Sequence, residues 1–129
     1  MSGYKTARLD EIAAEQWPYW APIRHHFDVR SFGINAWRGT EGDEVIKRHT
    51  EEEQNHEEIY VVLSGRATFE IGGEEVDAPA LTLVHISDPL TERVAVAKED
   101  GTVILSIGST LGAAYEPSGW DTSYLAGDS

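Results

Sequence analysis

The chain has 129 residues, of which 40% are hydrophobic and 26% charged, as expected for a single domain with one core. Its 23 acidic and 10 basic side chains give a net charge of −13, which would repel phosphate backbones and anionic membranes, so we expect no nucleic-acid or membrane partner. There is no cysteine, which excludes disulfides, thiolate metal sites and cysteine nucleophiles and fits a cytoplasmic location.

Residues 1–30 differ from the rest and are predicted to form an arm that packs on the main domain. Residues 4–9 fit a short strand, and Asp10 is a suitable N-cap for a helix over residues 10–16. The following run, Trp-Pro-Tyr-Trp-Ala-Pro at 17–22, would end that helix. Its aromatic side chains are expected to dock as a flap over the core.

Residues 31–112 read as short strands separated by turns, the pattern of a sandwich or barrel. Gly72-Gly73 and Asp100-Gly101 are hairpin signals. The tail, residues 113–129, becomes polar and its last residues are expected to be disordered. The expected strands cover residues 32–38, 44–49, 58–63, 67–71, 74–76, 81–86, 93–97 and 102–107.

The most informative segment is the acidic, histidine-bearing loop that leads into the strand Ile-Tyr-Val-Val-Leu at 59–63. Glu58 stands at the head of this strand, and it must be neutralised, hydrogen-bonded or bound to a cation because burying an unpaired charge is costly. The strand is apolar on both faces, so one face can line an interior while the other needs a cover. The outer face must be covered by a second sheet layer, by the N-terminal arm or by another subunit. We therefore expect a homodimer.

This segment resembles the first signature of the cupin superfamily, G-x5-H-x-H-x3,4-E-x6-G, found in small β-barrels that often hold a metal. Glu58 and Gly65 match its second half, and His49-Thr50-Glu51 takes the place of H-x-H if the loop carries a small insertion. A rigid count back from the glutamate gives two alternative pairs at the histidine positions: Glu52 and Gln54, or Glu51 and Glu53.

The second cupin signature, G-x5-P-x-G-x2-H-x3-N, is nearly absent, and Glu92 stands at its histidine position. The resemblance then implies a carboxylate-rich site for one divalent metal, Mn, Fe or Zn. His56 joins the candidates because it shares the face of Glu58 if the strand begins early. The alternative is a hydrogen-bonded Glu58 beside a solvated acidic loop without metal. The candidate metal ligands are His49, Glu51, His56, Glu58 and Glu92.

The resemblance implies an all-β fold, a cupin-like double-stranded β-helix or jelly-roll barrel over residues 31–112 with a short N-terminal arm. A small organic ligand would bind in its lumen against Tyr60, Val62, Phe69 and His85, although a lone histidine in an apolar strand is more often a hydrogen-bonded core residue. Two functions follow: a binding module without turnover, or a metal-dependent dioxygenase, isomerase or lyase. A purely structural dimer module is a weaker third, because it leaves Glu58 unexplained.

Overall fold

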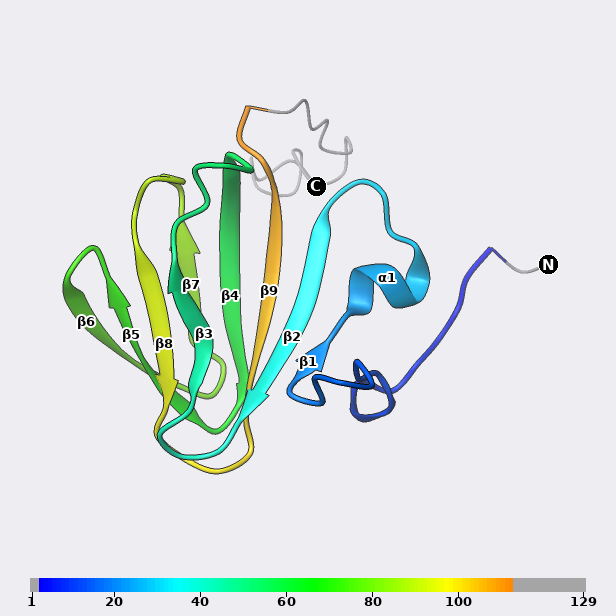
Figure 1. Ribbon diagram of the computed structural model, residues 1–129, viewed down its shortest axis with the longest axis horizontal. Helices are drawn as coiled ribbons and strands as arrows, with labels where there is room; N and C mark the ends of the chain where they lie inside the picture. The colour runs from blue at the N-terminus through cyan, green and yellow to red at the C-terminus, as the bar shows by residue number, and fades with distance from the viewer. Residues whose placement is uncertain (1–2, 113–129) are drawn as a thin grey trace, which may run out of the picture.

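The computed structural model describes residues 3–112, which form two facing antiparallel β-sheets (Figure 1). The first sheet has the strand order β1-β2-β9-β4-β7 and the second the order β3-β8-β5-β6. Each strand expected between residues 31 and 112 is present, so the all-β prediction is confirmed. The strands are β1 (Trp20–Ala21), β2 (Gly33–Gly39), β3 (Glu44–His49), β4 (His56–Ser64), β5 (Arg66–Ile71), β6 (Glu74–Pro79), β7 (Leu83–Ile86), β8 (Arg93–Ala97) and β9 (Thr102–Thr110).

The predicted local structure of the arm is wrong. Residues 4–9 form no strand, and in place of a helix over 10–16 there is one 3-10 turn, η1 (Leu9–Glu11). The helix of the arm, α1 (Ile23–Phe27), comes later and ends at Asp28, whose φ is 57°. The chain follows tertiary contacts here, because Ile12 is buried against Ala21 of β1 and Ala36 of β2. No helix among residues 3–112 is long and apolar enough to cross a membrane.

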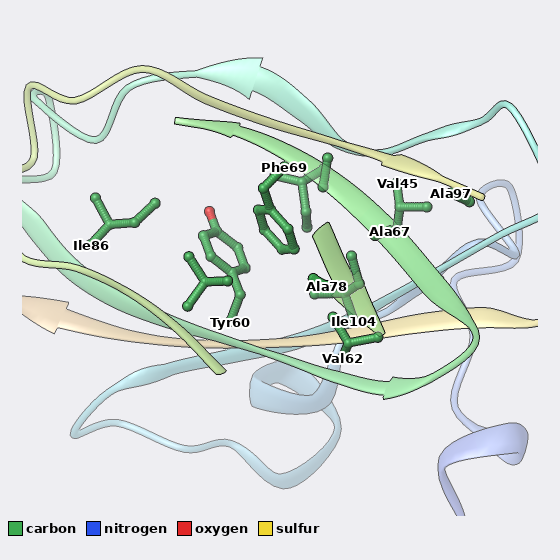
Figure 2. Packing of buried hydrophobic residues seen from close by; sticks show 12 residues of the cluster. Val45, Tyr60, Val62, Ala67, Phe69, Ala78, Ile86, Ala97 and Ile104 are labelled. Carbon is green, nitrogen blue, oxygen red and sulfur yellow. The ribbon is translucent and has the colours of Figure 1, made fainter. Parts of the chain in front are cut away.

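The main core lies between the two sheets and is built from alternate residues of their strands (Figure 2). Tyr60 and Val62 of β4 point inward and are 1% and 0% exposed. The Tyr60 ring packs against Phe69 of β5, with ring centroids 5.6 Å apart. This contact joins the two sheets across the interior.

The N-terminal arm covers part of the outer face of the first sheet, where α1 and β1 lie beside β2 (Figure 1). A second cluster joins Ile12, Ala21 and Ala36 with Leu105 of β9. Farther along the same face the arm does not reach β4 and β7. Ile59 and Leu63 are therefore about two-fifths exposed, at 38% and 39%. The tail, residues 113–129, lies outside the described residues.

Candidate functional site

Three of the expected site residues meet where the two sheets face each other. His49 is the last residue of β3, Glu51 lies in the loop that follows, and Glu58 is the third residue of β4 on the opposite sheet. Each side chain offers one ligand atom, and these atoms lie within 4.8 Å of one another. The loop insertion proposed from the sequence therefore brings His49 and Glu51 to the head of the apolar strand.

His49 and Glu51 form a hydrogen-bonded pair. The Nδ1 of His49 contacts the carbonyl oxygen of Lys47, and its Nε2 lies 3.2 Å from Oε1 of Glu51. The bond to Glu51 raises the pKa of His49 although partial burial opposes this. For Glu51, burial acts to raise the pKa, but the hydrogen bond and charge of His49 outweigh it, and the pKa of Glu51 is lowered. The pair thus favours a protonated imidazole beside an ionised carboxylate.

Glu58 is bound from the inside of the barrel by two donors. The Tyr60 hydroxyl donates to its Oε1 at 2.6 Å, and Nη1 of Arg93 donates to the same oxygen at 2.8 Å. Burial raises the pKa of Glu58, as does the nearby charge of Glu51, while the Tyr60 bond and the Arg93 charge oppose the rise. Burial and the Glu58 charge also raise the pKa of Tyr60, so its hydroxyl stays protonated and keeps donating.

Arg93 is a buried site residue that the sequence analysis did not identify. Its side chain is 0% exposed, at the start of β8, and β8 pairs with β3 so that Arg93 lies opposite His49. An arginine is expected outside unless it is paired. The signal that could have found it is the unmet charge of Glu58, which required a cation in the interior.

The structure places Glu92 elsewhere, which corrects the expectation that it enters the lumen. Its side chain is 53% exposed on the outside of the second sheet, where Arg48 donates to it at 2.7 Å. His85 also points outward and contacts Glu57, because β7 presents Val84 and Ile86 to the core instead. Neither residue belongs to the cluster of His49, Glu51 and Glu58.

A cavity of about 390 Å³ opens next to this cluster. Both apolar and polar side chains line it. Trp37 of β2 is fixed in the wall, because its ring stacks on Trp20 with centroids 5.9 Å apart and its Nε1 donates to Ser106 Oγ at 3.3 Å. The lining residues are Tyr19, Asn35, Trp37, Val45, Ile46, Lys47, His49, Glu51, Gln54, His56, Glu58, Tyr60 and Ser106.

Three of the four expected lining residues, Val62, Phe69 and His85, do not line the cavity. Tyr60 and His56 line the cavity, whereas Val62 and Phe69 are packed in the core away from it. Tyr19 comes from the arm and is 37% exposed, so the aromatic run at 17–22 contributes both a docked ring, Trp20, and a cavity wall. The wall residues of β2 and β3 were missed, because ordinary apolar strand residues carry no sequence sign of lining a cavity.

The donor set does not match a resident cupin metal. One imidazole is present in place of three, and Glu58 already carries the guanidinium of Arg93. Among residues 3–112, every fully buried side-chain nitrogen and oxygen has a hydrogen-bond partner. The two carboxylates, Glu51 and Glu58, instead face two cations of the chain itself, His49 and Arg93.

Comparison with known proteins gives the fold. No family model and no curated protein sequence matches the chain. A cupin protein of Bacteroides fragilis aligns with a TM-score of 0.74 at 21% identity, covering 92% of this chain and 93% of that one. A protein of Thermotoga maritima described as a predicted oxalate decarboxylase aligns at 0.56 and 16% identity, covering 68% and 74%.

A sugar phosphate isomerase of the cupin superfamily from Silicibacter pomeroyi also aligns, with a TM-score of 0.59 at 15% identity, covering 70% of this chain and 57% of that one. At these identities the likeness concerns architecture alone. The chain has the cupin fold, as its sequence predicts.

Proposed function

We propose that this cupin-fold chain binds a small organic molecule in the lumen, without turnover. The observation that carries the proposal is the cavity of about 390 Å³, whose lining combines apolar and aromatic side chains with a few polar ones. That combination and that size are typical of small-molecule sites.

The cavity favours a ligand with an apolar or aromatic body and a polar head. Trp37, Val45 and Ile46 offer the apolar surface, and the held indole of Trp37 provides a flat face for stacking. The Oε1 atom of Glu58 already accepts from Tyr60 and Arg93, which leaves the pair of His49 and Glu51 to meet the head. Glu51 can accept from hydroxyl or amine groups of the head, while the His49 ring, whose two nitrogens already contact Lys47 and Glu51, holds this carboxylate in place.

A fragment screen with paired glutamate variants tests the proposal. A library of neutral, cationic and anionic aromatic fragments is mixed with the protein, and binding is read by ligand-observed NMR. Fragments that bind the wild type should lose affinity in Glu51→Gln and keep it in Glu70→Gln, because Glu51 lines the cavity while Glu70 pairs with Arg48 on the outside. Binding that is equal in both variants would place the ligand elsewhere and reject the lumen site.

The competing function is metal-dependent chemistry, a dioxygenase, isomerase or lyase reaction. It rests on the proximity of His49, Glu51 and Glu58, within 4.8 Å of one another. We rank it second because Arg93 already neutralises Glu58. Metal analysis of tag-free protein, purified without chelator and supplemented with Mn, Fe or Zn, separates the two: one ion per chain would favour the enzyme.

We also propose that the chain forms a homodimer through the outer face of the first sheet that the arm leaves open. Ile59, Leu63 and Leu83 lie on this face, and Leu83 is 65% exposed. Burying such a patch in an interface would remove its contact with water. Light scattering should give about twice 14.3 kDa, and Leu83→Lys should return the mass to one chain. A monomeric wild type would contradict the dimer.

A further inference from the structure

Among residues 3–112, Arg93 has the largest fully buried side chain, and every nitrogen of its guanidinium donates a hydrogen bond. Nη1 donates to Glu58 Oε1, while Nε and Nη2 donate to the carbonyl oxygen of Thr91 at 3.1 and 2.9 Å. Nη2 also reaches the carbonyl oxygen of Asp88 at 3.4 Å. The side chain is therefore held in one position, and its charge is permanent because a guanidinium does not lose its proton in a protein.

This fixed cation lies at the carboxylate that a metal would need. A divalent ion held by His49, Glu51 and Glu58 would share Glu58 with the guanidinium at 2.8 Å. Two like charges on one buried carboxylate repel strongly, because the interior screens them weakly.

We propose that Arg93 takes the place of a metal ion in this barrel: it is a built-in counter-ion that holds the Glu58 carboxylate aimed inward and excludes a divalent cation. The carboxylates of the proposed lumen site then need no metal ion to balance their charge. The proposal does not depend on which ligand the cavity takes. It distinguishes Arg93 from an ordinary buried ion pair, because only a residue in the cation's place should open a metal site when it is replaced.

The test is a Co²⁺ titration, in which visible absorption reports coordination by the protein. Chelator-treated wild type is compared with Arg93→His, which removes the permanent charge and adds an imidazole beside the three donors. The wild type should bind Co²⁺ substoichiometrically, and R93H should bind one ion with an affinity higher by about tenfold or more. Adding Glu58→Gln to R93H should abolish the gain.

Arg48→His is the matched control for adventitious binding. Arg48 lies between the carboxylates of Glu70 and Glu92 on the outside of the second sheet, so R48H also puts an imidazole beside two carboxylates. It should show no comparable gain. If R93H does not fold, Arg93→Gln replaces it, because it removes the charge, stays polar and should likewise gain Co²⁺ affinity.

Two results would overturn the proposal. In one, the wild type binds Co²⁺ at one ion per chain as tightly as the variants at position 93. In the other, the folded variant gains nothing over the wild type. Neither result bears on fragment binding by the wild type, so the failure of this proposal is distinguishable from failure of the lumen ligand site.

Discussion

Replacing Glu58 by glutamine tests whether the chain itself neutralises this carboxylate. Glu58 and Arg93 form a buried ion pair whose side chains are 11% and 0% exposed. Glu58→Gln keeps an acceptor oxygen for Tyr60 and Arg93 but removes the negative charge. The guanidinium then remains in the interior with no countercharge in contact, since its other acceptors are the backbone carbonyl oxygens of Thr91 and Asp88.

The expected loss follows from this geometry. Breaking a buried ion pair by removing one partner costs about 3–5 kcal/mol, and the lower end applies because glutamine retains the hydrogen bonds. Burial and the Glu51 charge, which raise the pKa of Glu58, act against the ionised form, so we expect the free energy of unfolding to fall by at most about 3 kcal/mol. With an unfolding entropy of about 2.1 cal/mol/K per residue over 129 residues, that loss lowers Tm by at most about 11 °C.

Urea denaturation and thermal melts of Glu58→Gln measure this loss, with Asp77→Asn as the matched control. Asp77 also accepts a bidentate arginine, Arg66, but that pair is half exposed. Its neutralisation should therefore cost much less, because solvent screens the charge left behind. If E58Q is no less stable than D77N, the buried pair does not hold Glu58, and the reasoning on Arg93 fails with it.

Two further predictions concern the turn after β4 and the titration of the site. In denaturant melts, Gly65→Ala should destabilise the fold by about 2 kcal/mol more than Gly101→Ala. Both glycines have φ of +74°, so the backbone strain of an alanine is the same at the two positions. A Cβ at Gly65 would also lie 2.6 Å from the Thr102 Cα, whereas one at Gly101 would have no atom within 4 Å. Equal losses would show that the clash is relieved. The folded-state pKa of His49 lies above its ordinary 6.5, so the stability it contributes is fully present below about pH 6.5 and is lost as the pH rises through the folded-state pKa. Urea melts between pH 5.5 and 8.5 should show this decline, and His49→Gln should flatten it; a decline of the same size in both proteins would assign it to other groups.

The strands of this fold were predictable because their signals are local. Alternation of apolar residues and glycine turns such as Gly72-Gly73 act within a few residues, and β2 to β9 appear where those signals stand. The arm was not predictable, because η1 and α1 are too short to be stable alone. Burial of Ile12 and stacking of Trp20 on Trp37 decide their place, and these contacts join residues far apart in the sequence.

The site was predictable in part for the same reason. The position of Glu58 at the start of an apolar strand predicts a buried carboxylate from the sequence alone. The structure places Glu58 together with His49 and Glu51. That these residues bind a metal stays a prediction, as does the cytoplasmic location. The cavity wall was not predictable, since Val45 and Ile46 are adjacent yet both buried. The register of β3 against β8 shifts on either side of Ile46, which breaks the alternation that a sequence pattern assumes.

Counting along the second cupin signature selected Glu92 as a site residue, whereas the residue that enters the barrel is its neighbour Arg93. Asking which cation neutralises Glu58 would have selected Arg93. Side chains alternate along a strand, so a shift of one residue exchanges inside and outside. Glu92 at the signature position pairs with Arg48 outside, and Arg93 beside it enters the barrel to meet Glu58. The sequence already required that Glu58 be hydrogen-bonded, neutralised or bound to a cation. Arg93 meets that requirement from within the chain, so a signature that has lost its histidines argues for a search for a buried arginine before a metal is assigned.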